Sequence, residues 1–250
     1  MKNKSEYIKF ILPLLIIFFW FIFTYTGKVP PTSLPSLSAV KDTFIDMLKS
    51  GQLSNDLSLS LRRVLAGFFI SSILGISLGI FMGISSKAKE FFQLTLTAIR
   101  QIPMIAWIPL IILWAGIGEV SKIVVILFAA TFPIVVNTMG GVDSTSETYL
   151  EVAKMYGLSK KDTFFKVYLP SALPNIFTGL RLGLGASWMA VVASELIASS
   201  SGIGYRLNDA RSLMRSDVVI VCMIIIGLVG LLMDKLIVLI SHELTPWKKN

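Results

Sequence analysis

Long apolar stretches make up most of the chain, and the charged residues gather between these stretches rather than within them. Each apolar stretch is long enough to form a helix across the hydrocarbon core of a bilayer, which takes about 20 residues. The pattern therefore predicts an all-α polytopic membrane protein with about six transmembrane helices. The expected spans are 8–26, 61–85, 98–119, 122–140, 173–197 and 218–240.

Lys2, Lys4 and Lys9 gather at the start of the first apolar run, 8–26, a charge pattern that membrane anchors share with cleaved secretion signals. The length of this run, and the lack of a small-x-small cleavage pattern in the TGKVPPTS that follows, favour a retained anchor. The segment 38–61 alternates apolar and polar residues at helical spacing. We expect it to lie in the membrane interface rather than to cross the membrane.

The second span carries a small residue at every fourth position. These residues are Gly67, Ser71, Gly75, Gly79 and Gly83. Residues four apart share one face of a helix, so they form a flat stripe on which another helix can pack closely. Helix packing is the expected role of this stripe. The alternative is a wall of a solute path, because small residues also leave room for a solute.

The third span contains Pro103 and Pro109 within a short apolar stretch. Proline lacks a backbone N–H and disrupts a helix, so this span is expected to be broken. Backbone carbonyls freed at membrane depth are tolerated only against protein or water. The third span is therefore expected to face a solute path or a partner helix. In the fourth span, Pro133 predicts a kink.

One polar and basic stretch, 145–170, interrupts the otherwise apolar sequence. Ser146 can cap a short helix, and Gly157 supplies the left-handed stop at its end. The apolar stripe of this helix consists of Tyr149, Val152, Ala153 and Tyr156. Ser159 and Asp162 then start a second short helix as a capping box.

The second short helix is expected to end at Leu169 and Pro170, because proline is not tolerated inside a helix. Two short amphipathic helices joined at a glycine form a knob rather than a span. We call residues 145–170 the docking knob. An apolar face held at the membrane surface between long spans predicts a docking site for a soluble partner.

The composition agrees with a membrane protein. Hydrophobic residues make up 54% of the chain and charged residues 15%, and the mean hydropathy of +0.75 exceeds what a soluble core of this length requires. The formal net charge is +8, but no basic stripe with interleaved aromatics indicates nucleic-acid binding. Basic residues are more frequent at both chain ends, in 86–100 and in the docking knob than in the other loops. This bias predicts that both termini and the knob are cytoplasmic.

The sequence carries no catalytic signature. It has no phosphate-binding loop, no G-x-S-x-G elbow and no H-E-x-x-H motif. The single cysteine, Cys222, and the single histidine, His242, exclude an intrachain disulfide and argue against a zinc site. We therefore expect no enzymatic activity, metal or cofactor in this chain. A membrane domain with a docking knob and no nucleotide site indicates a transporter driven by a separate ATPase.

Seven residues of the docking knob resemble a known motif. They are Glu151, Val152, Ala153, Gly157, Val167, Leu169 and Pro170. Their spacing resembles the EAA loop of ATP-binding-cassette importer permeases that work with a substrate-binding protein. That loop reads E-A-A, three residues, G, nine residues, I, one residue and L-P. The two valines replace an alanine and the isoleucine, and both keep the apolar contact.

The resemblance implies a fold and a set of partners. The fold would be that of a type I importer permease, with the docking knob as the coupling helix in a cleft of a cytoplasmic ATPase dimer. The coupling residues would be Glu151, Ala153, Tyr156, Gly157, Leu169 and Pro170. The other partners would be an extracytoplasmic substrate-binding protein and a second, identical permease subunit. ATP and magnesium would bind only to the ATPase, and the permease would be a multi-pass protein of the bacterial plasma (inner) membrane.

The resemblance extends from about residue 35 to about residue 236, and is carried by four further stretches. They are RQIPMIAWIPLIILWAGIGE, SKIVVILFAATFPIVVNT, GLRLGLGASWMAVVASELI and SGIGYRLNDAR. These resemble the permease branch for aliphatic sulfonates, taurine and nitrate. The resemblance implies an anionic cargo, with an aliphatic sulfonate or taurine as the first candidate. Nitrate or a pyrimidine precursor of thiamine is the alternative cargo. An autonomous channel or a membrane-embedded enzyme is the alternative from another class.

The sequence then forms one permease domain, 1–250. We expect an anchor and interfacial segment at 1–60 and a permease core at 61–240. Polar and aromatic residues within the core are candidates for the translocation path. They are Arg181, Trp188, Glu195, Asn137 and Trp107. For each of them, a structural role in packing or pairing is the competing interpretation.

Among these candidates, Arg181 needs a partner, solvent or an anion, because an arginine within a span is costly. Its structural partners could be Glu195 or Asp234. Glu195 lies fourteen residues further along the same helix, which is about 20 Å at ~1.5 Å per residue, so a straight helix forbids a direct pair. The polar outer loop 199–211 is either a docking site for a binding protein or a solvated connector.

Overall fold

The computed structural model describes residues 4–27 and 29–248, and within them the chain is helical without any strand. The helices are α1 (Lys4–Tyr25), α2 (Leu37–Lys49), α3 (Gln52–Ile84), α4 (Ser86–Arg100), α5 (Met104–Ala115), α6 (Glu119–Asp143), α7 (Glu147–Met155), α8 (Lys160–Thr163), α9 (Leu169–Ala198), α10 (Ile203–Ser212) and α11 (Ser216–Leu244), with a π-helical turn η1 (Phe164–Tyr168) and a 3₁₀ turn η2 (Pro246–Lys248). The predicted all-α class is confirmed.

Four helices, α3, α6, α9 and α11, are long and apolar enough to cross a membrane, and α9 meets that test together with α8 and η1. The bent pair of α4 and α5 passes the same test as one broken span, and makes a fifth. In α1, the apolar part Phe10–Tyr25 is shorter than these spans, and Lys2 lies outside the described residues. The described chain thus has up to five spans, plus the α1 helix, where the sequence predicted six spans.

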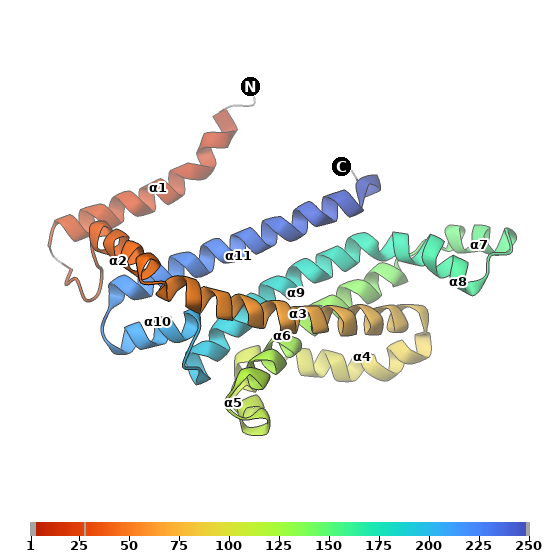
Figure 1. The fold of residues 1–250 in the computed structure, drawn as a ribbon. Coiled ribbons are helices and arrows are strands. Elements are labelled where there is room, and N and C mark those ends of the chain that lie inside the picture. The colour runs from red at the N-terminus through yellow and green to blue at the C-terminus, as the bar shows by residue number, and fades with distance from the viewer. Residues whose placement is uncertain (1–3, 28, 249–250) are drawn as a thin grey trace.

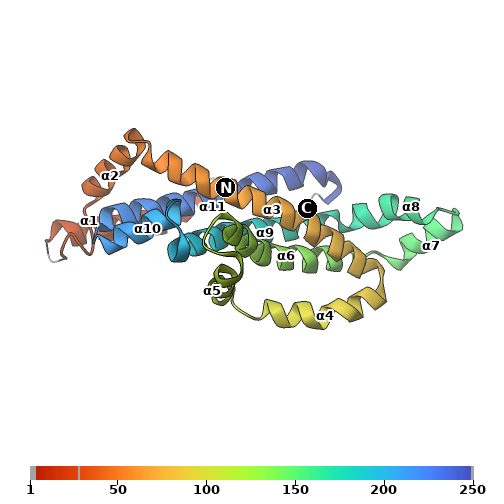
Figure 2. The ribbon, with the colours of Figure 1, turned by 60° about the horizontal axis from the view of Figure 1, so that its bottom comes forward.

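The long helices run roughly along one direction, and the shorter helices lie at the two ends of this bundle. Figures 1 and 2 both show α7 and α8 at one end, and α2 and α10 at the other. Most of α1 lies apart from the bundle in Figure 1. The largest group of buried apolar residues joins α2, α3, α9, α10 and α11 at the end away from the docking knob.

The face of α3 that carries the small residues lies against α6. Ser71 is fully buried, and its hydroxyl donates to the carbonyl of Gly67. A Cβ atom on each glycine would stand 2.6–2.7 Å from an α6 side chain. The pairs are Gly67 with Ile126, Gly75 with Ile134, Gly79 with Thr138 and Gly83 with Val142. The α6 partners also recur at multiples of four residues. A straight row of α6 side chains therefore packs against the straight row of small residues on α3.

This close approach predicts opposite effects for one substitution at two helical glycines. Gly75→Ala places a methyl group 2.7 Å from Ile134 Cγ2, and overpacking of this kind costs about 1–3 kcal/mol. At Gly227 of α11 nothing lies within 4 Å of the added atom, so Gly227→Ala is expected to be neutral or to stabilise by about 0.5–1 kcal/mol. Thermal unfolding in detergent measures both, and a Gly75→Ala variant as stable as Gly227→Ala would contradict the contact.

The broken third span is confirmed. The helix α4 ends at Arg100, the helix α5 starts at Met104 after Pro103, and the two helices meet at an angle of 98°. In contrast, Pro109 and Pro133 lie inside α5 and α6. The span that was expected to begin at residue 61 is longer, because α3 runs without a break from Gln52, across the expected boundary between the interfacial segment and the core.

The predicted end of the second knob helix at Leu169 and Pro170 is wrong. The helix continues from α8 through η1 into α9, and reaches Ala198. In the π-helical turn, the N–H of Leu169 donates to the carbonyl of Phe164, five residues back. Pro170 then stands in the first turn of α9, where its missing N–H is tolerated. The change from π to α geometry therefore lets the docking knob join the fifth span as one rod.

Candidate functional site

The docking knob is folded by local signals at Gly157. This glycine has φ of +63°, the left-handed conformation predicted for it. The N–H of Leu158 donates to the carbonyl of Ala153, and that of Gly157 to Lys154, both at 3.0 Å. These two bonds close the end of α7 as a Schellman motif. These local hydrogen bonds thus reverse the chain between α7 and α8.

The two caps of the docking knob differ. Ser146 occupies the N-cap position of α7, but its side chain accepts no capping hydrogen bond. Ser159 caps α8, since its hydroxyl accepts the N–H of Asp162 at 3.1 Å. The Ser159 hydroxyl also lies 2.6 Å from the Asp162 carboxylate, which forms an ion pair with Lys166. The predicted cap at Ser159 is therefore confirmed, whereas the predicted cap at Ser146 is wrong.

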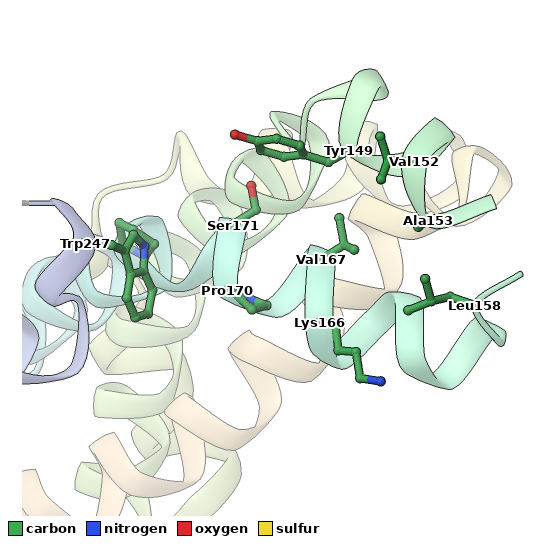
Figure 3. A pocket seen from close by; sticks show the side chains of 10 residues that line it. Tyr149, Val152, Ala153, Leu158, Lys166, Val167, Pro170, Ser171 and Trp247 are labelled. Atoms are coloured by element: carbon green, nitrogen blue, oxygen red, sulfur yellow. The ribbon is translucent and has the colours of Figure 1, made fainter. Parts of the chain in front are cut away.

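An apolar groove of about 750 Å³ lies between α7 and the rod of α8, η1 and α9. Figure 3 shows Tyr149 and Val152 on one wall and Val167 and Pro170 on the other, with Trp247 at the end away from Leu158. The groove is lined by Tyr149, Val152, Ala153, Leu158, Lys166, Val167, Pro170, Ser171, Pro174 and Trp247. Trp247 of the C-terminal turn η2 thus lines the same groove as the docking knob, a placement that the sequence pattern did not indicate.

The residues expected to couple to an ATPase divide into a surface group and a supporting group. Tyr156 is 82% exposed, its neighbour Met155 is 86% exposed, and Glu151 is exposed too. In contrast, Ala153 is buried within the turn, and Leu169 packs against a cluster that includes Ile176. The knob therefore presents an apolar tip on a small packed base. Solvent exposure of this kind on large apolar side chains is typical of a protein contact.

A polar cluster at the opposite end of the bundle holds Glu195. Its carboxylate accepts hydrogen bonds from Arg63 at 2.7 Å, from the Ser60 hydroxyl at 2.8 and 2.9 Å, and from the N–H of Gly204 at 3.0 Å. The residue is only 1% exposed. Arg63 also makes a two-pronged contact with Glu119, at 2.6 and 2.7 Å. Glu195 is thus bound within the chain.

Sequence reasoning did not identify Arg63 as the partner of Glu195. Arg63 lies 132 residues before Glu195, and no spacing rule links positions so far apart. One signal was present: an arginine and a glutamate within spans each require a partner, and both stand toward the ends of their helices that lie away from the docking knob. Arg63 further donates to the carbonyl and hydroxyl of Ser201, which ties the outer loop to α3.

The other expected path residues have partners of their own, with one exception. Arg181 forms a two-pronged ion pair with Asp234 of α11, at 2.5 and 2.7 Å, which was one of its two expected partners. Trp188 is 4% exposed and donates to the carbonyl of Ile226, and Asn137 donates to the carbonyl of Pro133. Trp107 instead lines a cavity at the bend between α4 and α5.

The polar outer loop is also fixed by an acidic side chain of α3. The carboxylate of Asp56 accepts the N–H of Gly202 at 3.2 Å and the guanidinium of Arg206 at 2.8 Å. Gly202 has φ of +105°, and a Cβ atom there would collide with Glu195. Within residues 4–27 and 29–248, no three His, Cys, Asp or Glu side chains are grouped as metal ligands.

Three curated relatives resemble this chain over most of its length. A Bacillus subtilis protein named as an aliphatic sulfonates transport permease is 37% identical over 96% of this chain and 87% of its own. A taurine transport system permease protein of Escherichia coli is 32% identical, with coverage of 94% and 87%. A nitrate import permease protein of Synechocystis is 37% identical, with coverage of 75% and 68%.

A family model and a solved structure agree with these relatives. The model described as binding-protein-dependent transport system inner membrane component matches residues 71–245. A chain in a crystal structure of an amino acid ABC transporter with histidines has a TM-score of 0.66 at 16% identity, over 80% of this chain and 98% of that chain, which shows a shared fold. The protein belongs to this family of inner-membrane transport components, and it is a multi-pass permease of the ABC importer class.

Proposed function

We propose that the protein is the permease of an importer for small organic sulfonates, taurine among them. The observation that carries this proposal is the similarity to sulfonate and taurine permeases over nearly the whole of this chain and most of theirs. The nitrate permease covers less of both chains. Nitrate is therefore the second candidate cargo. A pyrimidine precursor of thiamine has no observation in its favour among these relatives.

Two identical copies of the chain enclose the path, and two ATPase subunits bind the two docking knobs. In this arrangement both termini and the knobs are cytoplasmic, and a substrate-binding protein docks on the outer face formed by α2, α10 and the outer loop. The exposed apolar tip at Met155 and Tyr156 supports the ATPase contact. The permease makes and breaks no covalent bond, and ATP with magnesium binds to the ATPase.

Movement passes through the rod that joins the docking knob to the fifth span. Because α8, η1 and α9 form one continuous helix, no flexible joint separates the knob from α9. A movement of the knob is therefore transmitted directly to α9. The ion pair of Arg181 with Asp234 and the contact of Trp188 with Ile226 join α9 to α11. ATP binding closes the ATPases, draws the knobs together and opens the path outward. Hydrolysis restores the inward-facing state.

Uptake by the reconstituted complex tests this function. The permease, its ATPase and its binding protein are placed in proteoliposomes with internal ATP, and taurine, methanesulfonate, nitrate and hydroxymethylpyrimidine are compared as radiolabelled solutes. We expect ATP-dependent uptake of a sulfonate and none when the ATPase lacks its phosphate-loop lysine. Uptake of nitrate alone would shift the assignment to the second cargo, and flux without ATP would indicate a channel.

A further inference from the structure

A cavity of about 180 Å³ lies at the break between α4 and α5, with α6 as its wall. The proline that separates the two helices, Pro103, lines the cavity, and so do residues of both helix ends. Those used below are Arg100, Met104, Trp107, Phe128 and Phe132. The cavity therefore exists because the span is broken, since a straight helix would fill this space.

The cavity lies about halfway through the membrane. Lys89 of α4 forms an ion pair with Asp143 of α6 at 2.6 Å, which places the cytoplasmic ends of the two helices side by side. Arg100 comes eleven residues after Lys89, and Phe132 comes eleven residues before Asp143. At ~1.5 Å per residue, both lie about 16 Å from that pair, and the hydrocarbon core is about 30 Å thick.

Arg100 is a cation without a partner at this depth. It is exposed, and no hydrogen bond or ion pair from it occurs within the described part of the chain. Arg63 and Arg181, which also lie in membrane helices, each contact carboxylates. Arg62, beside Arg63 and nearer an end of its helix than Arg100 is to the far end of the α4–α5 span, belongs to no ion pair of the described residues either. An arginine at mid-membrane is costly unless a counter-charge or water neutralises it, and such residues mark substrate paths. The cavity therefore has one positive charge available to an anion.

Aromatic side chains form the other wall of the cavity. The ring centroid of Phe128 lies 5.3 Å from Trp107 and 6.4 Å from Phe132. The indole N–H of Trp107 has no acceptor among the described residues, whereas those of Trp20 and Trp188 each donate to a backbone carbonyl at 2.9 Å. The cavity thus combines a cation, a free N–H donor and an apolar surface.

We propose that this cavity is an anion-binding subsite of the translocation path, specific for an oxyanion head that carries a short carbon chain. Arg100 binds two oxygens of the head with its planar guanidinium, and the N–H of Trp107 donates to a third. Phe128 and Phe132 cover the carbon chain. A sulfonate uses all three features, whereas nitrate leaves the aromatic wall without a partner. The inference rests on the proposed function, whose cargo it refines.

Uptake by the full complex tests the charge at this subsite. Arg100→Gln is expected to reduce ATP-driven uptake of taurine by at least about tenfold, the loss of one charged hydrogen-bonding group, and Arg100→Lys by less. Lys87→Gln, at the cytoplasmic end of α4, is the matched control and keeps wild-type uptake. Taurine uptake by Arg100→Gln equal to that by Lys87→Gln, with equal assembly on gel filtration, would overturn the subsite.

A second experiment does not depend on the identity of the cargo. In a Cys222→Ala background, Met104→Cys reacts with a methanethiosulfonate reagent bearing either a sulfonate or a trimethylammonium group, without ATP. The ratio of the anionic to the cationic rate is expected to fall at least about tenfold on adding Arg100→Gln. The ratio at Ile117→Cys, on the exposed loop before α6, is expected to stay unchanged.

The two experiments separate the subsite from the proposed function. A wild-type complex that imports no sulfonate refutes the cargo assignment, and the modification ratio still reports whether Arg100 attracts anions. If the complex imports sulfonates but the ratio is insensitive to Arg100→Gln, the subsite is wrong and the function stands. Failure of both reagents to reach Met104→Cys would also refute the subsite, because a position on the path must be open to water.

Discussion

The Arg63→Met variant is expected to lose about 3–5 kcal/mol of unfolding free energy, the cost of removing one partner of a buried ion pair. All five N–H donors of Arg63 are used, and its side chain is only 4% exposed. Methionine has a similar length but leaves the buried carboxylate of Glu195 without its cation. The hydrogen bonds from Ser60 and Gly204 remain, and they carry no compensating charge. Unfolding in detergent measures the loss.

The neighbouring arginine supplies the control for this variant. Arg62 is exposed and belongs to none of the ion pairs of the described residues, so Arg62→Met is expected to change stability by less than about 0.5 kcal/mol. The double variant Arg63→Met with Glu195→Leu is expected to recover much of the loss, because apolar residues often replace a buried ion pair without cost. Equal stability of Arg63→Met and Arg62→Met would show that the pair is not buried as described.

The Gly157→Pro variant is expected to reduce ATP-driven uptake to background while the permease still inserts and assembles. Proline fixes φ near −65°, whereas Gly157 has φ of +63°. The substitution also removes the N–H that bonds to Lys154, so the chain cannot leave α7 in the same direction. We therefore expect that the tip no longer fits the cleft that we propose for it in the ATPase. Uptake and binding-protein-stimulated ATP hydrolysis in proteoliposomes measure the uncoupling.

Two further variants show whether this loss comes from the docking surface. Gly27→Pro makes the same change at a left-handed glycine in the loop after α1, far from the docking knob, and is expected to retain uptake. Tyr156→Ala removes an exposed ring without altering the backbone, so it is expected to weaken binding of the ATPase and leave thermal stability unchanged. Wild-type uptake in both Gly157→Pro and Tyr156→Ala would refute the coupling role of the docking knob.

Features encoded within one helix or one turn were predictable from the sequence. The left-handed stop at Gly157, the cap at Ser159 and the break at Pro103 each depend on a few adjacent residues. The spacing from Glu151 to Pro170 also identified the family. These predictions succeed because capping, proline and helical periodicity act over one or two turns.

The error at Pro170 shows the limit of such local rules. A proline usually marks a helix end, but its missing N–H is harmless where the hydrogen-bond pattern changes anyway. The preceding π-helical turn provides that change. Nothing in the residues of this turn distinguishes it from an α-helix, so the continuous rod became visible only in the structure.

The sequence by itself determined that this chain is an apolar helical membrane protein, that its third span breaks, and that a polar docking knob interrupts its spans. Only the tertiary structure decided which charges meet: Glu195 with Arg63, Arg181 with Asp234, and Arg100 with none in the described chain. The physical reason is that such pairs join helices far apart in the sequence. The distances between these charges follow from helix packing and not from helical periodicity. The cavity that leaves Arg100 available to an anion follows from helix packing as well.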